Sequence, residues 1–306
     1  MAKNSRHGPY GQEVRIEAEG AVLAGRLFSP DGPPRAAVLL SGATGVPQRY
    51  YRDFAHWLVR ERGLAVLTYD YRDFGASQTG TLRASRANMT DWAVHDPQAA
   101  RDRLAALYPD QPLWVIGHSV GALCLPLQRG LEGIARIVAV ASGPVHLSDH
   151  PWHYRPIAAA FWHGPPRLAT ALLGYTPGRR LGLGADLPAG VYRQWRRWCL
   201  SRSFYAGDVG TALPLPAAVP PSCAMRVVDI SDDPMIPPHV VWRLMAAYPE
   251  TWRDQKVLHP AAYSLQRIGH LGAFHRRAAA CWPDLIGPSG SSSTYGLADA
   301  ERPDVA

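Results

Sequence analysis

Short apolar runs alternate with longer segments of helical spacing along most of this chain, and this alternation constrains the fold more than any other feature. A pair of segments with alternating apolar and polar residues comes first and predicts a β-hairpin at a sheet edge. Continuous apolar runs are typical of strands buried on both faces of a parallel sheet. The sequence therefore predicts an α/β fold, with a mostly parallel central sheet and helices on both faces. The expected strands are 13–19, 21–28, 35–41, 64–70, 112–117, 134–142, 224–230 and 252–258.

Helical spacing predicts helices between these strands, including one from Val120, one over 237–248 and a last one from about residue 272. Residues 145–223 interrupt the alternation, because they are rich in Trp, Pro and Gly and contain no apolar run of strand type. Their helical patches are 156–162, 166–173 and 190–200. Ligand sites of α/β proteins lie at the carboxyl ends of the strands, so an insertion here would cover such a site.

The domain organisation follows from this interruption. We expect residues 13–144 and 224–287 to form the core and residues 145–223 to form a helical cap. The Ser- and Gly-rich residues 288–306 predict a disordered tail.

Composition excludes several classes of protein. With 47% hydrophobic and 19% charged residues, the chain can bury a core. Its net charge of +7 comes from scattered arginines without a nucleic-acid signature, so we expect no nucleic-acid partner. The cysteines form no Cys-x-x-Cys pair, no apolar run reaches the length of a membrane span, and the polar residues 1–13 lack the apolar stretch of a signal peptide. The expectation is a cytoplasmic protein without metal, disulfide framework or membrane span.

Gly117-His118-Ser119-Val120-Gly121 directly follows an expected strand and opens an expected helix. This is the G-x-S-x-G pattern in the strand–turn–helix context that a nucleophile elbow requires. A serine on so tight a turn needs small neighbours two residues away on each side. The turn would expose its hydroxyl above the sheet and direct the Val120 amide toward a developing oxyanion. Ser119 is therefore the predicted nucleophile.

A serine hydroxyl needs a base to remove its proton and an acid to orient that base. The turn after strand 224–230 contains Asp232 and Asp233, whereas Asp229 lies within the strand itself. We favour Asp233 as the acid and keep Asp232 as the alternative. His270, between two glycines after the strand 252–258, is the expected base, on a loop that presents the imidazole.

The second oxyanion donor should come from the loop after strand 35–41. Glycines on either side of Ala43 and Thr44 let the backbone approach a substrate closely. The Ala43 amide is the first choice and the Thr44 amide the alternative.

These motifs resemble the α/β-hydrolase superfamily over about residues 13–285. More narrowly, they are similar to a bacterial group near the monoacylglycerol-lipase-like and serine-aminopeptidase-like branch. The resemblance implies Ser119 as nucleophile, Asp233 as acid and His270 as base. Ser41 and Ala273 depart from residues common in the superfamily, but neither belongs to the triad. The matching motifs are GATGVPQRYY (42–51), YDYRDFGAS (69–77), IGHSVGA (116–122), SDDPMIP (231–237) and IGHLGAF (268–274).

We therefore predict a cofactor-free serine hydrolase that cleaves a small or medium acyl ester through an acyl-enzyme. An acyl thioesterase and an acyltransferase would use the same triad, and arginines such as Arg193 and Arg197 could recruit an anionic substrate like an acyl-CoA. Classes outside the hydrolases are a non-catalytic ligand-binding homologue and an NAD(P)-binding oxidoreductase. The glycines at 42 and 45 favour the oxidoreductase, but Gln48 at the third glycine position does not. His146, His150 and His153 could suggest a metal site, although a loop leading into the cap is the expected structure.

The sequence leaves open the acyl length, the leaving group, the choice among ester, thioester and amide, the pathway and the oligomeric state.

Overall fold

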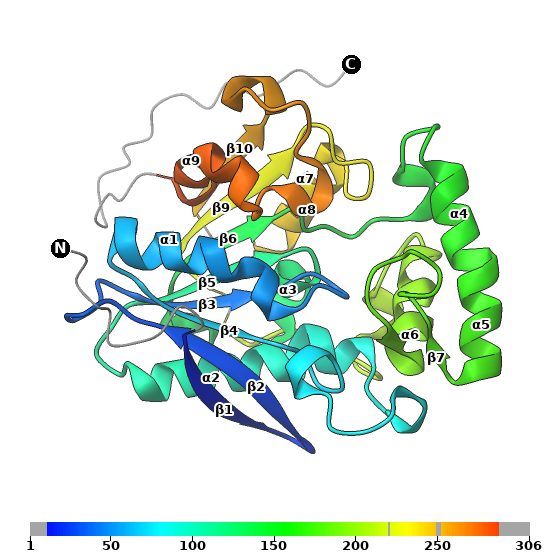
Figure 1. Cartoon of the computed structure of the whole chain (residues 1–306), viewed down its shortest axis with the longest axis horizontal. Coiled ribbons are helices and arrows are strands. Elements are labelled where there is room, and N and C mark those ends of the chain that lie inside the picture. Colours follow the sequence, from blue (N-terminus) through cyan, green and yellow to red (C-terminus); the bar gives the residue numbers. More distant parts are fainter. Residues whose placement is uncertain (1–10, 220, 249–251, 288–306) are drawn as a thin grey trace.

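The computed structural model describes residues 11–219, 221–248 and 252–287. An eight-stranded sheet in the order β1-β2-β4-β3-β5-β6-β9-β10 crosses the molecule (Figure 1). β1 and β2 form an antiparallel hairpin, β2 pairs antiparallel with β4, and the other pairs are parallel. The expected hairpin and mostly parallel sheet are confirmed. The strands are β1 (Gln12–Ala18), β2 (Ala21–Phe28), β3 (Ala37–Ser41), β4 (Ala65–Tyr69), β5 (Leu113–His118), β6 (Ile134–Val140), β9 (Ala224–Ile230) and β10 (Trp252–Leu258).

Helices cover both faces of this sheet, as the continuous apolar runs predict. Along β3, Ala37 and Leu39 face one hydrophobic cluster, and Val38 and Leu40 face the other. Successive side chains of a strand point to opposite faces of the sheet, so a strand that is buried on both faces must be apolar throughout. The first cluster packs against α2 (Asp96–Leu107), α3 (Val120–Leu123) and α7 (Pro238–Arg243). The second packs against α1 (Arg52–Arg62) and α9 (Trp282–Ile286).

Three expected helices are shorter than their apolar spacing predicts. The helix from Val120 ends after four residues, and Pro126 lies in the 3₁₀ turn that follows. The segment 237–248 ends its α-helix at Arg243 and continues as 3₁₀ turn. The short helix α8 (Gly269–Gly272) precedes the last expected helix, and from about residue 272 the chain forms a 3₁₀ segment over Arg276–Cys281 followed by α9, which has Pro283 in its first turn. Proline has no amide to donate within a helix, so it ends one segment or begins another.

Residues 145–223, named here the cap segment, contain three helices and a two-stranded ribbon grouped at one end of the sheet (Figure 1). The proposed division into core and cap stays a prediction, and residues 288–306 lie outside the described residues. The elements are α4 (Arg155–His163), α5 (Pro165–Leu173), β7 (Tyr175–Thr176), β8 (Leu187–Pro188) and α6 (Ala189–Cys199).

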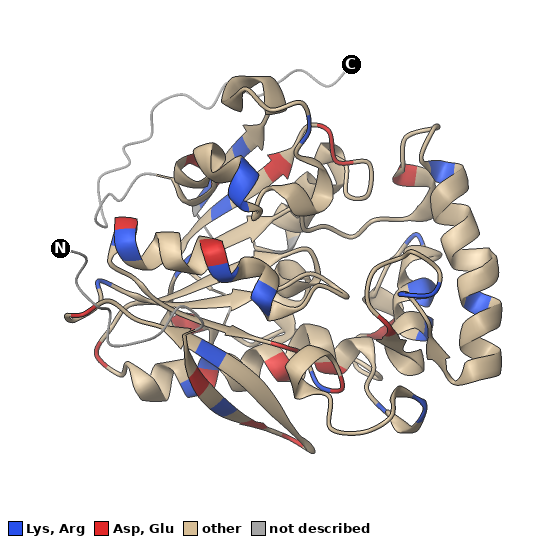
Figure 2. Ribbon diagram, in the orientation of Figure 1, with Lys and Arg blue, Asp and Glu red and all other residues tan. Residues whose placement is uncertain are grey.

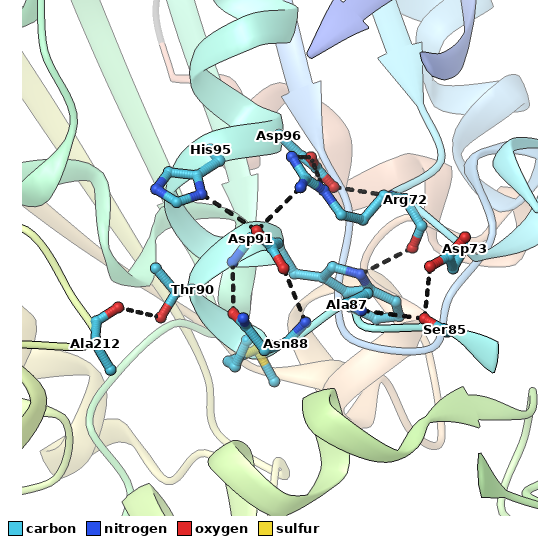
Figure 3. Close-up of polar contacts among 12 residues, drawn as sticks. Arg72, Asp73, Ser85, Ala87, Asn88, Thr90, Asp91, His95, Asp96 and Ala212 are labelled. Atoms are coloured by element: carbon cyan, nitrogen blue, oxygen red, sulfur yellow. Dashed lines mark hydrogen bonds and ion pairs between the residues drawn. The ribbon is translucent and has the colours of Figure 1, made fainter. Parts of the chain in front are cut away.

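A buried ion-pair cluster supports the core where the cap segment rests on it. The Arg72 guanidinium lies between the carboxylates of Asp91 and Asp96, at 3.0 and 2.7 Å (Figure 3). Asp91 begins a π-helical turn that continues into α2. The Thr90 hydroxyl, at the start of this turn, donates to the Ala212 carbonyl of the cap segment at 2.8 Å. The cluster therefore holds the residues that touch the cap segment.

Candidate active site

Ser119 occupies a strained turn between β5 and α3. Its backbone has φ 55° and ψ −117°, which non-glycine residues rarely adopt. The Ser119 amide donates to Val140 O at 2.9 Å, and the Ser142 hydroxyl donates to Ser119 O at 2.6 Å. A Cβ atom added to Gly121 would lie 2.3 Å from Ser41 O. The tight turn thus requires glycine at 121, as the elbow pattern implies.

Asp233 and His270 form a buried acid–base pair. His270 Nδ1 lies 2.7 Å from Asp233 Oδ2, and Asp233 as a whole residue is 3% exposed. Asp233 Oδ1 accepts hydrogen bonds from the amides of Met235 and Ile236, which fix its orientation. When Nδ1–H donates to the carboxylate, Nε2 is left as the free acceptor that a general base needs.

Ser119 and His270 line the same cavity. Within the described residues, no hydrogen bond joins the Ser119 hydroxyl to the imidazole. The structure thus brings the expected acid and the expected base into contact and places Ser119 at the same cavity, while the roles of the three residues and the serine–histidine link stay predictions. Catalytic hydrogen bonds commonly tighten only when substrate is bound.

The two alternative aspartates have different positions. Asp232 accepts hydrogen bonds from the amides of Ile268 and Gly269, both at 3.0 Å, so it holds the turn that carries His270. Asp229 stays inside β9 and receives a hydrogen bond from Gln255. His270 itself lies in the one-turn helix α8 and is buried, which corrects the expectation of an open loop. The turn is anchored through Asp232 rather than left free.

A second row of hydrogen bonds lies behind the imidazole. His118 Nε2 lies 3.0 Å from the His270 carbonyl, and His118 Nδ1 lies 2.8 Å from the Tyr51 hydroxyl. The carbonyl can only accept, and burial lowers the pKa of His118, so this ring is neutral with its proton on Nε2. Nδ1 must then accept from Tyr51. Neither Tyr51 nor His118 was predicted as a site residue, and the only signal for them in the sequence was the polar His118 inside the serine motif.

The Tyr51 hydroxyl also accepts a hydrogen bond from one of the two expected oxyanion donors. The Ala43 amide donates to the Tyr51 hydroxyl at 2.8 Å, so in this structure it is not free to bind an oxyanion. Thr44 lines the cavity, and its amide has no acceptor among the described residues. Val120 also lines the cavity at the start of α3. The geometry therefore favours the alternative pair, Val120 with Thr44.

The cavity beside Ser119 has a volume of about 730 Å³ and is mostly apolar. No Asp, Glu, Lys or Arg among the described residues lines it. Arg193 and Arg197 are not part of its wall, and Arg197 instead pairs with Asp208 at 2.5 Å. The suggested cationic rim is therefore wrong for these arginines, and basic residues are spread over the whole molecule (Figure 2). The aromatic wall comes from the cap segment: Tyr154, Phe161, Trp162, Trp195, Trp198 and Phe204.

The part of the chain that the structure describes contains no group of three His, Cys, Asp or Glu side chains that could hold a metal ion. His146 Nδ1 instead lies 2.7 Å from the Ser148 hydroxyl, and His150 Nδ1 lies 3.0 Å from the Pro234 carbonyl. None of the helices in residues 11–219, 221–248 and 252–287 has the length and apolarity needed to cross a membrane.

Comparisons with known proteins agree with the fold. A model of the family described as serine aminopeptidase, S33, matches residues 32–174. Monoglyceride lipase of Mus musculus is 27% identical over 135 residues, which are 44% of this chain and 39% of the lipase. The family match contains Ser119 but ends before Asp233 and His270.

Solved structures extend the likeness over most of the chain. An esterase of Pyrococcus furiosus has a TM-score of 0.57 at 14% identity and covers 94% of this chain and 92% of its own. The α/β-hydrolase domain-containing protein 10 from mouse has a TM-score of 0.53 at 11% identity and covers 90% and 95%. At these identities the likeness concerns the fold alone, and the expected α/β-hydrolase fold is confirmed.

Proposed function

We propose that this chain, which has the α/β-hydrolase fold and is similar in part to the serine aminopeptidase S33 family and to monoglyceride lipase, is a serine hydrolase that cleaves carboxylic esters. The observation that supports this proposal most is the hydrogen bond between Asp233 and His270. His270 and Ser119, which lies on a strained turn, line the same apolar cavity. The aligned part spans only 39% of the lipase's length, so its activity comes to this chain as a proposal.

The proposed reaction proceeds through an acyl-enzyme. Ser119 Oγ attacks the acyl carbonyl while His270 Nε2 takes the hydroxyl proton, and Asp233 stabilises the imidazolium. The amides of Val120 and Thr44 donate to the oxyanion. The bond to the alcohol oxygen then breaks as His270 returns the proton to it. Water, activated by the same imidazole, releases the carboxylic acid and restores the serine.

The cavity wall favours esters over two related substrates. An aminopeptidase needs an acidic group for the substrate's α-ammonium, and an acyl-CoA thioesterase needs cations for phosphates. The absence of charged residues from the described wall supports neither. A volume of about 730 Å³ lies in the range of sites that enclose drug-sized ligands. A long apolar acyl chain therefore fits as well as the small or medium chain expected from the sequence.

The test combines a nucleophile variant with a substrate series. Ser119→Ala should lower kcat for p-nitrophenyl esters by a factor of about 10³ or more, because the attacking oxygen is lost. The variant should also lose labelling by a fluorophosphonate probe while its circular dichroism stays that of the wild type. A parallel series with matching acyl-CoA thioesters should give lower kcat/KM at every chain length. Unchanged turnover of the variant would remove Ser119 from the mechanism.

A further inference from the structure

The cavity beside Ser119 opens to solvent at one end, which is named here the mouth. Ile157, Leu183 and Leu271 line the cavity and are 58%, 46% and 41% exposed, so they touch both the cavity and the solvent. Leu271 directly follows His270. The proposed base therefore lies on the side of the mouth, and the alcohol that receives its proton leaves in that direction.

The other end of the cavity is buried. Four residues of its wall, named here the closed end, are at most 6% exposed: Met89, Leu123, Trp198 and Phe204. Val120 and Leu123 lie three residues apart on α3 and both line the cavity, so one face of this helix forms the wall that leads away from Ser119. An acyl chain attached to Ser119 then runs along α3 toward the closed end.

Phe204 lies where this path ends. Burial and the nearby Cys124 thiol raise the pKa of Tyr205, the residue after Phe204. Cys124 is the residue at which α3 ends. Phe204 therefore belongs to the part of the wall beyond the end of the helix that begins at the nucleophile.

The backbone of Phe204 is strained. Its φ is 51°, which a bulky residue rarely adopts. In the part of the chain that the structure describes, five residues other than glycine have a positive φ, and two of them, Ser119 and Phe204, line the cavity. Strain of this kind persists only where the surrounding structure imposes it, and it is concentrated at functional sites.

The turn that carries Phe204 lies on the surface and directs the ring inward. The Phe204 amide donates to Ser201 O at 3.0 Å, and Arg202 and Ser203, which lie between them, are exposed. The Phe204 ring itself is buried and packs against the Trp198 ring, with centroids 5.8 Å apart. The ring therefore separates the cavity from the solvent at the closed end.

We propose that Phe204 determines the length of the acyl chain, because its ring closes the cavity at the point where the chain ends. The preferred substrates are esters whose acyl chain reaches from Ser119 to Phe204. Longer chains are excluded, because the ring cannot move without losing its contact with Trp198. This inference rests on the proposed function and deepens it.

The experiment measures kcat/KM for p-nitrophenyl esters of straight-chain fatty acids of increasing length. In the wild type, kcat/KM should rise about fourfold for each added methylene, the effect of burying that group, until the chain reaches Phe204, and should fall for longer chains. Phe204→Ala should move this limit to longer chains by about two or more carbon atoms, because the missing ring leaves a cavity. Phe204→Gly should move it likewise and fold at least as stably, since glycine adopts a positive φ without strain.

Tyr205→Ala is the matched control. Tyr205 packs against the same Trp198 ring, with centroids 5.9 Å apart, but does not line the cavity, so the limit should stay where it is in the wild type. A limit that is unchanged in Phe204→Ala and Phe204→Gly would overturn the assignment. An equal fall of kcat/KM at every chain length would also overturn it, since a purely structural role has that effect.

A binding measurement separates this inference from the proposed function. Isothermal titration calorimetry of Ser119→Ala with free fatty acids should give the same limit in Kd, and adding Phe204→Ala should move it to longer chains. If the wild type hydrolyses no ester and takes up no fluorophosphonate, but fatty acids bind with this limit, the proposed function fails and the role of Phe204 stands. If the limit in Kd is the same with and without the Phe204 ring, that role is wrong whatever the turnover.

Discussion

Two regions of the molecule are held in place in different ways. One is the sheet edge, which carries Ser119, Asp233 and His270, and the other is the cap segment. At the sheet edge, backbone hydrogen bonds and close backbone contacts determine the positions. Ser119 is fixed through its own amide and carbonyl, and Asp232 holds two amides next to His270. Gly121 leaves no room for a side chain. The proposed reacting groups therefore lie on backbone that parallel strands and tight turns keep rigid.

The cap segment is attached to the core through a few buried side chains. Gln194 Oε1 of α6 accepts from the amides of Met89 and Thr90, at 2.9 and 3.1 Å. Gln194 Nε2 donates to Thr90 Oγ1 and to Asp208 Oδ2, and Asp208 also accepts from Trp198 Nε1 at 2.7 Å. Met89 and Trp198 line the cavity, so these contacts shape the space for substrate.

This difference separates two kinds of effect. Substitutions at the sheet edge should act on the chemical step and lower kcat. Substitutions in the attachment of the cap segment should act on substrate binding and raise KM.

Asp233→Asn should have the largest effect. The amide cannot hold the imidazole in the required tautomer, so kcat should fall by about 10⁴-fold with little change in KM. Steady-state kinetics on a p-nitrophenyl ester measures both values. Asp232→Asn is the control, because that residue bonds backbone amides rather than the imidazole. If kcat fell further in Asp232→Asn than in Asp233→Asn, the acid would be Asp232 and the proposed assignment would be wrong.

Asp208→Ala should have an intermediate effect, on stability and KM. The change leaves the Trp198 indole N–H and the Gln194 amide without their shared acceptor, which should lower the free energy of unfolding by about 2–3 kcal/mol. KM should rise several-fold while kcat changes little. Urea unfolding and initial rates measure the two effects. Arg202→Ala, an exposed change in the same segment away from the cavity wall, should change neither value, and a fall in kcat alone for Asp208→Ala would contradict the separation.

The smallest expected effect is on the pH dependence of stability. Two buried aspartates should contribute to the free energy of unfolding with opposite dependence on pH. Burial raises the pKa of Asp229 to about 6, although Gln255 donates to it. Burial acts on Asp208 in the same direction, but hydrogen bonds from Arg197, Gln194 and Trp198 hold its pKa below the usual range. A carboxyl with a raised pKa contributes stability that is present below the unfolded pKa and lost as pH rises through the folded value. A carboxyl with a lowered pKa loses its contribution as pH falls.

Asp229→Asn should therefore raise the free energy of unfolding more at pH 8 than at pH 4, by about 1–2 kcal/mol. Urea unfolding at several pH values measures the difference. The free energy gained should grow between the unfolded value near 4 and the folded value of about 6. A gain that is the same at pH 4 and pH 8 would show that Asp229 is not a buried charge at neutral pH.

The strands were predictable because burial on both faces leaves a continuous apolar run in the sequence. Their observed ends lie within two residues of the expected ranges, as for β6, expected at 134–142 and found at Ile134–Val140. Helix lengths were less predictable, since Pro126 and Pro283 interrupt segments with suitable apolar spacing. The pairing of Asp233 with His270 agrees with the order of motifs, whereas the partner of the Ala43 amide does not follow from any local pattern.

By itself, the sequence determined the alternation of strands and helices, the glycine-dependent turn at Ser119 and the few residues able to act as acid and base. These are local properties of residue type and spacing. Only the tertiary structure decided that the Tyr51 hydroxyl bonds the Ala43 amide and that aromatic residues of the cap segment line the cavity beside Ser119. Hydrogen-bond partners and cavity walls come from segments far apart in the chain, and the folded arrangement alone brings their atoms within reach of one another.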